Sequence, residues 1–194
     1  VEVEEMSRKK KMDHQERMID SEQLLLETGY DSFHFRLLAE RLGVGRSTLY
    51  EYYANKDDLI TAYVHSFAYE RVEECKLVLG IDDLQDQIEA FLRVFLKYNH
   101  IQQIVIMVTQ MEGQKKPQNE ENILHIKKLI KDINAISFQI IQKGKREGKI
   151  RQELDDMFIS YMMFNLIQLP NFRQQSDEER LKQFVDFLLN GVST

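Results

Sequence analysis

The sequence is poor in residues that interrupt helices or cross-link chains. Its 194 residues include two prolines, eight glycines and one cysteine. Few prolines and glycines favour a helical protein, because both residues are costly inside a helix. Cys75 has no second cysteine to pair with, and the adjacent Glu73 and Glu74 do not favour a thiolate, so we expect it to fill space. The length allows one large domain or two small ones.

Long apolar runs are also missing. No stretch of about 18 apolar residues predicts a membrane span, and no basic segment followed by an apolar one predicts a secretory signal. We therefore expect a cytoplasmic protein with no membrane partner.

The spacings that enzymes use are absent as well. The five histidines never pair at i and i+4, no Glu-x-x-His occurs, and neither a phosphate-binding glycine loop nor a Gly-x-Ser-x-Gly turn is present. We expect no catalytic residues, no metal and no other cofactor.

Basic charge is scarce overall and placed locally. The formal net charge of -6 argues against indiscriminate binding to nucleic acid, because such proteins are usually basic throughout. The basic groups are a run at residues 8–11 and the separate Arg36, Arg46 and Lys56, with Glu40 and Glu51 nearby. This balance favours a specific DNA-binding protein with a modest electrostatic contribution.

The segment from Gly29 to Ile60 predicts two short helices joined by a glycine turn and followed by a third. Phe35, Leu38, Ala39 and Leu42 fall at i, i+3, i+4 and i+7, so they form one apolar helix face. Gly43 can end this helix in the left-handed conformation, with Val44 as an apolar plug. The next segment, 46–52, directs Leu49 inward and leaves polar and aromatic side chains outside, as in a helix-turn-helix. Asn55 can cap the third helix, whose first turn carries Asp57 and Asp58.

These residues resemble the TetR family of bacterial transcriptional regulators. The matching pieces, in order, are Gly29-Tyr30, Leu38-Ala39, Gly43-Val44, Thr48-Leu49-Tyr50, Tyr53 and Lys56-Asp57-Asp58-Leu59. The link at 144–156 and the ending Leu188-Leu189-Asn190-Gly191 also resemble the family, whereas the middle of the chain resembles it less. A multi-part match over some thirty residues is far more specific than one short motif.

The resemblance implies an all-α fold with an N-terminal three-helix DNA-binding head and a C-terminal helical body for ligand binding and dimerisation. We expect the head at residues 1–54 and the body at residues 55–194. The pattern predicts helices at about 12–28, 35–42, 46–52, 56–79, 84–98, 120–147, 157–169 and 177–190.

The resemblance and side-chain chemistry together give a set of candidate DNA contacts. Arg46 can bond two acceptors on a guanine, and Arg36 matches a position that touches bases in some members. The full set is His34, Arg36, Arg46, Ser47, Thr48, Tyr50, Tyr52 and Lys56. His34 stands where the family often has a capping Thr, so either Ser32 caps the helix or its start is looser; His34 can equally be solvated. Gly45 replaces a common Ser or Thr, which puts a side-chain cap contact at the start of the recognition helix in doubt.

The body is expected to bind a small effector that is apolar or aromatic. Candidate pocket residues are Phe67, Phe91, Phe95, Tyr98, Met107, Met111, Phe138, Tyr161 and Phe164. Each of these side chains can equally be ordinary core.

The helix at 157–169 is apolar almost all round and must be covered on most sides, which suggests a second subunit. Candidate residues of a homodimer interface are Phe158, Met162, Leu166, Leu181, Phe184, Val185 and Leu188. The expected function is a repressor that binds a palindromic operator in double-stranded DNA as a dimer and is released by its effector. A helical dimeric adaptor that does not touch DNA is the alternative.

Overall fold

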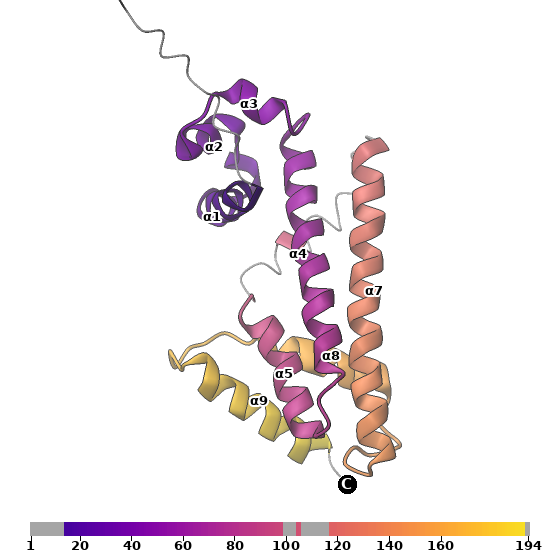
Figure 1. Cartoon of the computed structure of the whole chain (residues 1–194). Helices are drawn as coiled ribbons and strands as arrows, with labels where there is room; N and C mark the ends of the chain where they lie inside the picture. Colours follow the sequence, from indigo (N-terminus) through magenta and orange to yellow (C-terminus); the bar gives the residue numbers. More distant parts are fainter. Residues whose placement is uncertain (1–13, 99–103, 106–116, 193–194) are drawn as a thin grey trace, which may run out of the picture. The chain divides into compact units, whose positions relative to one another are not determined.

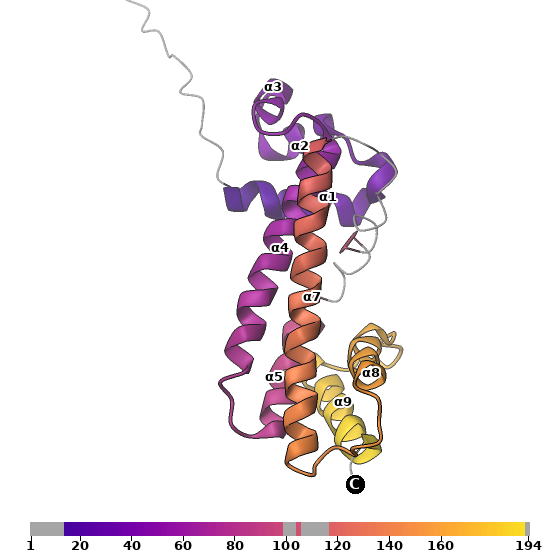
Figure 2. The same ribbon diagram turned by 90° about the vertical axis from the view of Figure 1, so that its right-hand side faces the viewer.

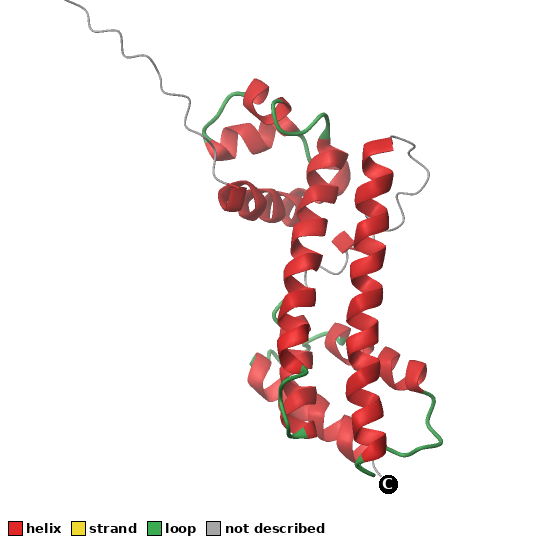
Figure 3. Cartoon of the chain, turned by 45° about the vertical axis from the view of Figure 1, so that its right-hand side comes forward, coloured by secondary structure: helices red, strands yellow, loops and turns green. Residues whose placement is uncertain are grey.

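The computed structural model describes residues 14–98, 104–105 and 117–192. Every regular element in this part of the chain is an α-helix (Figures 1 and 3). The helices are α1 (His14–Ser32), α2 (Phe35–Leu42), α3 (Arg46–Tyr50), α4 (Lys56–Val78), α5 (Leu84–Leu96), α7 (Pro117–Arg146), α8 (Asp156–Gln168) and α9 (Asp177–Val192). The predicted all-α fold is confirmed.

The two largest differences between predicted and observed helix ends are the end of α1 and the start of α7. α1 extends past residue 28, but Gly29 takes a non-helical φ of 71°, so regular geometry does break where the pattern predicts it. The long helix α7 begins at Pro117 rather than near residue 120, because proline is well tolerated in the first turn of a helix.

The chain divides into two compact units, residues 1–63 and residues 64–194. The first turns of α4 therefore belong with the N-terminal unit. A functional boundary after residue 54 remains a prediction.

The N-terminal unit holds α1, α2, α3 and the start of α4 around a small apolar core. Its fully buried side chains include Phe33, Leu38, Leu49 and Leu59. Gly43 ends α2 with a left-handed φ of 64°, while the Val44 N–H donates to the Ala39 carbonyl at 3.0 Å. This αL ending confirms the predicted turn between the two helices of the helix-turn-helix.

The C-terminal unit packs α5 against α7, α8 and α9, and α7 against α8. Figures 1 and 2 both place α5, α8 and α9 around the C-terminal half of α7. Asp83 caps α5 by accepting from the N–H groups of Gln85 and Asp86, and Asp155 caps α8 by accepting from the Phe158 N–H. Caps of this kind fix where each helix begins, so the apolar faces meet in register.

Cys75 is fully buried in this unit, as expected for a residue that fills space. Burial, with a further contribution from the charge on Glu74, raises the pKa of the Cys75 thiol to about 12. The thiol is therefore protonated at neutral pH and a poor nucleophile.

Candidate nucleic-acid interface

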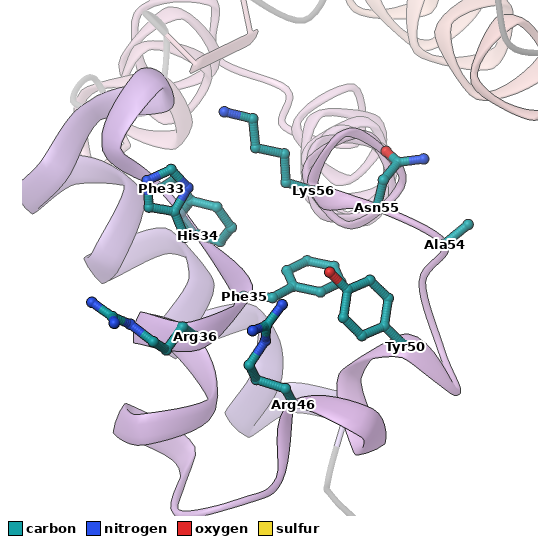
Figure 4. A pocket seen from close by; sticks show the side chains of 9 residues that line it. All are labelled: Phe33, His34, Phe35, Arg36, Arg46, Tyr50, Ala54, Asn55 and Lys56. Carbon is teal, nitrogen blue, oxygen red and sulfur yellow. The ribbon is translucent and has the colours of Figure 1, made fainter.

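Cationic and aromatic side chains surround one groove in the N-terminal unit (Figure 4). The groove has a volume of about 380 Å³ and is lined by Phe33, His34, Phe35, Arg36, Arg46, Tyr50, Ala54, Asn55 and Lys56. Five of the predicted DNA contacts thus meet at one site. They come from three chain segments, which are the start of α2, the helix α3 and the start of α4.

The two arginines of the groove are exposed and weakly held. Arg36 lies 3.8 Å from Glu40, but both side chains are highly exposed, and such surface pairs are worth little. Arg46 is exposed and forms an ion pair with no other described residue. Both guanidinium groups are therefore available to an external anion or base edge.

The recognition helix α3 is only five residues long and depends on its surroundings. Gly45 stands at its N-cap position, and no side chain caps the helix there, as the sequence predicted. Leu49 anchors the helix in the core with no exposed surface, and the rings of Phe35 and Tyr50 lie 5.0 Å apart. Ser47 is exposed and Thr48 is half-buried, so the outer face of α3 keeps hydroxyl groups accessible.

His34 occupies the N-cap position of α2 in extended backbone geometry, but its side chain makes no capping hydrogen bond. The looser of the two predicted arrangements is therefore the one observed, since Ser32 belongs to α1 and does not cap α2. The His34 side chain is exposed at the edge of the groove (Figure 4).

Replacing His34 with serine should stabilise the N-terminal unit. A serine hydroxyl at this position can accept from the first N–H groups of α2, which the imidazole does not do, and such caps contribute about 0.5–2 kcal/mol. Thermal unfolding followed by circular dichroism measures the gain. His34→Ala is the matched control, because it removes the ring without adding an acceptor. Equal melting temperatures for the serine and alanine variants would show that the cap does not form.

Lys56 is more constrained than the sequence suggested. Its Nζ donates to the Tyr30 carbonyl at 2.9 Å and lies 4.0 Å from the centroid of the Tyr30 ring. The Tyr30 hydroxyl in turn donates to Asp57 Oδ1 at 2.7 Å. Burial first, and then this hydrogen bond, raise the pKa of the Tyr30 phenol. The Lys56 ammonium is thus fixed in direction, with donors left over for a second partner.

Asn55 caps α4 as predicted, because its Oδ1 accepts from the N–H groups of Asp57 and Asp58 at 2.8 and 3.1 Å. The role of Tyr30 was missed. Its adjacency to Gly29 marked it as part of a motif, but its contacts lie 26 and 27 residues along the chain, beyond any local pattern.

Comparison with known proteins supports the interpretation of the N-terminal unit as a DNA-binding head. Residues 21–63, which include the whole groove, match the model of the family described as bacterial regulatory proteins, tetR family. The matched segment is a DNA-binding head of the TetR family. The chain is a DNA-binding transcriptional regulator of the helix-turn-helix class.

Relatives match this chain over most of its length. An uncharacterised HTH-type transcriptional regulator, YvaF of Bacillus subtilis (strain 168), is 25% identical over 175 residues, covering 88% of this chain and 90% of that one. FadR from Bacillus subtilis, solved with stearoyl-CoA, has a TM-score of 0.67 at 16% identity and covers 93% and 100% of the two chains. AibR, solved with isovaleryl coenzyme A and operator DNA, has a TM-score of 0.71 at 16% identity and covers 90% and 97%. At these identities the two structures support the fold alone.

The aromatic residues predicted for an effector pocket fall into separate groups in the body. Phe91, Phe95 and Phe164 form a cluster whose ring centroids lie 5.0–5.9 Å apart, and Phe91 is fully buried. Phe67 and Tyr98 form an edge-on pair at 5.4 Å. Phe138 is half-buried, Tyr161 is exposed, and Met107 and Met111 lie outside the described residues.

Arg71 is a body residue that sequence reasoning missed. It is buried, its guanidinium carbon lies 3.9 Å from the Tyr98 ring centroid and 4.8 Å from that of Phe67, and it bonds Glu74 at 2.9 Å. A polar group therefore stands among side chains that had been interpreted as purely apolar. Its position in a helix of mixed polarity gave no signal of burial.

A larger groove of about 620 Å³ lies between α4 and α5 and contains none of the predicted pocket residues. It is lined by Glu74, Leu77, Val78, Ile81, Asp86, Glu89, Ala90, Arg93, Val94 and Lys97. Leu77 is the most exposed of its apolar residues.

Most of the predicted interface residues are buried within the single chain. Leu166, Leu181, Phe184, Val185 and Leu188 belong to the core of the C-terminal unit. The reason is that α9 packs closely on α5, so its apolar stripe is covered by its own chain. Met162 is half-buried, and Phe158 is 53% exposed.

Other apolar side chains on α8 and α9 do reach the surface. Met157 and Tyr161 on α8 and Phe187 on α9 are each about half exposed or more. Together with Phe158, they form what we call the α8–α9 apolar face.

Two further observations concern the described residues alone. They hold no group of three or more histidine, cysteine, aspartate or glutamate side chains arranged to bind a metal ion. Likewise, no helix among them has the length and apolar character needed to span a membrane.

Proposed function

We propose that this chain is a ligand-responsive repressor that binds a palindromic operator as a homodimer and is released by a small, largely apolar effector. The observation that carries the proposal is the convergence of Arg36, Arg46 and Lys56 on one groove beside a short, exposed recognition helix. In a chain with a net charge of -6, such a local concentration of cations marks the face for DNA.

The groups on this face divide by chemistry into base and backbone contacts. Arg46 and Arg36 carry planar donor pairs suited to the O6 and N7 acceptors of guanine in the major groove. Ser47 and Thr48 can serve bases or phosphates, whereas Tyr50, Tyr52, His34 and Lys56 suit the backbone. Backbone contacts fix the position of the head, and the arginines supply sequence preference.

A gel-shift assay against the DNA upstream of the chain's own gene tests the proposal. A specific band that survives excess unrelated DNA is expected. The alternative, a dimeric helical adaptor, gives no specific band. Footprinting of the bound site should reveal two half-sites related by a dyad, because a two-fold dimer presents two equivalent recognition helices.

Replacing Lys56 with alanine should weaken binding to every DNA sequence alike. A lysine that contacts one phosphate releases condensed counterions, so its loss should make the slope of log K against log[KCl] shallower by about one. Titrations at several KCl concentrations measure both effects. Lys128→Ala removes an exposed lysine of α7 and should leave the slope unchanged. If the slope of log K against log[KCl] is the same for Lys56→Ala as for the wild type, Lys56 serves only to hold Tyr30.

The α8–α9 apolar face is the part of the body that we propose joins two subunits. Phe158 and Tyr161 are three residues apart, so they lie on the same side of α8, and they are 53% and 60% exposed. Exposed aromatic clusters of this kind are typical of protein interfaces.

Replacing Phe158 with glutamate should therefore convert the dimer to a monomer at micromolar concentration. A charge buried in an apolar interface has no partner there, which costs several kcal/mol. Sedimentation velocity reports the change in mass, and Leu77→Glu, another exposed apolar position, is the control. A dimer that persists in Phe158→Glu would place the interface elsewhere.

The proposed effector site lies among the rings of the body. The cluster of Phe91, Phe95 and Phe164 and the pair of Phe67 and Tyr98 offer apolar walls, with the Arg71 guanidinium as a polar group beside the second. FadR and AibR were each solved with an acyl coenzyme A ester, which makes such esters the first compounds to screen.

A further inference from the structure

The structure raises the question of what holds the end of the recognition helix in place. α3 has five residues and no side-chain cap at its start, and Glu51 follows it with helical backbone angles as the C-cap. Backbone bonds from the N–H groups of Tyr52 and Tyr53 to the Leu49 carbonyl, at 3.1 and 3.0 Å, close the last turn. These bonds fix the main chain, but they leave the direction of the Tyr52 side chain open.

Arg17 of α1 supplies the missing support. Its guanidinium carbon lies 4.2 Å from the centroid of the Tyr52 ring. Arg17 is only 7% exposed, whereas Tyr52 keeps 43% of its surface exposed, so the ring covers the cation and presents its other side to solvent. A cation held over an aromatic face contributes about 0.5–2 kcal/mol, with the larger values where the cation is desolvated.

Burying an arginine is costly unless its charge is compensated, and the Tyr52 ring is one of the groups that stabilise the buried Arg17 guanidinium. The contact ties α1 directly to the segment that follows α3. It also brings a positive charge to the inner side of a ring whose hydroxyl is available for hydrogen bonding. A phosphate oxygen that accepts from this hydroxyl would also be attracted by that charge.

We infer that Arg17 is a positioning residue for operator binding, which holds the Tyr52 ring so that its hydroxyl donates to a DNA phosphate. The inference rests on the proposed function, because it requires Tyr52 to face the DNA backbone. It adds a residue from α1, outside the helix-turn-helix, to the set that determines affinity.

The test is a double-mutant cycle between Arg17 and Tyr52, measured as operator affinity in the full-length chain. Arg17→Met removes the cation and keeps much of the side-chain bulk, and Tyr52→Phe removes only the hydroxyl. Arg17→Met should weaken binding by about 2- to 30-fold, the range that corresponds to one cation–π contact. Tyr52→Phe should then cost little more in the Arg17→Met background, because the hydroxyl is no longer held in place.

Two further variants separate positioning from general stability. Arg17→Lys should recover much of the lost affinity, since an ammonium also binds a ring face. Arg41→Met removes another arginine of the same unit, which bonds Glu27 of α1 at 2.8 and 3.0 Å but contacts no residue of α3 in the described contacts. It should lower the melting temperature without changing operator affinity at 25 °C.

The possible results are distinct. The inference is overturned if Arg17→Met binds as tightly as the wild type, if the losses in Arg17→Met and Tyr52→Phe simply multiply, or if Arg17→Lys binds no better than Arg17→Met. A melting curve for each variant confirms that the chain is folded at the assay temperature. If the wild-type chain itself binds no specific DNA, the proposed function fails, and this result is separate from any difference among the variants.

Discussion

An Arg46→Ala variant is expected to bind the operator about 5- to 150-fold more weakly than the wild type, a loss of about 1–3 kcal/mol. Arg46 is the first residue of the recognition helix and is exposed. Among the described residues it has no acidic partner that would compete with a base for its guanidinium. A guanidinium that bonds two acceptors of one guanine loses both bonds together when it is truncated. The variant should also lose its preference for one base pair.

The measurement is a panel of operators, each with one base pair changed, titrated at a fixed salt concentration. Wild type should discriminate against substitutions at one position in each half-site, and Arg46→Ala should bind all bases at that position alike. Arg41→Ala is the matched control, because Arg41 is engaged with Glu27 and Asp20 rather than with the groove. An Arg46→Ala variant with unchanged base preference would remove Arg46 from the set of base contacts.

The helix-turn-helix could be predicted from the sequence because its signals are local. Phe35, Leu38 and Ala39 are spaced for one helix face, and the structure buries all three. Gly43 takes the left-handed conformation that its place after the last periodic residue indicated. Asn55 caps α4 through residues two and three positions later, again within the reach of a sequence pattern.

The helices of the body could be predicted as well, but not the packing between them, because packing depends on which surfaces meet in three dimensions. The sequence predicts the apolar stripe of α9, with Leu181, Phe184 and Leu188. The spacing of these residues does not indicate which surface the stripe packs against. The same stripe fits another helix of its own chain or a second subunit, and here it packs on α5. Buried arginines are a similar case, since Arg71 and Arg17 look like surface residues until the rings that cover them are placed.

The Phe91→Ala variant tests whether the aromatic rings of the body belong to the core or line a pocket. Phe91 is fully buried, with its ring 5.0 Å from that of Phe95 and 5.9 Å from that of Phe164. Truncation removes the ring and leaves a cavity that neighbouring side chains fill only in part. We expect the free energy of unfolding to fall by about 3–5 kcal/mol, the usual cost of a Phe→Ala change in a core.

Urea unfolding followed by circular dichroism measures this loss, and Tyr161→Ala, at a position 60% exposed, should change the free energy by less than about 0.5 kcal/mol. The two interpretations of Phe91 predict opposite results. If Phe91 is a core residue, its truncation lowers the free energy of unfolding and leaves the response to an effector intact in the molecules that remain folded. If Phe91 lines an empty pocket, its truncation lowers the free energy of unfolding only slightly, and it weakens the effector's ability to release DNA. Because Phe91 has no exposed surface, the large loss of stability is the expected result, and the effector should then contact the less buried rings of Phe95, Phe67 and Tyr98.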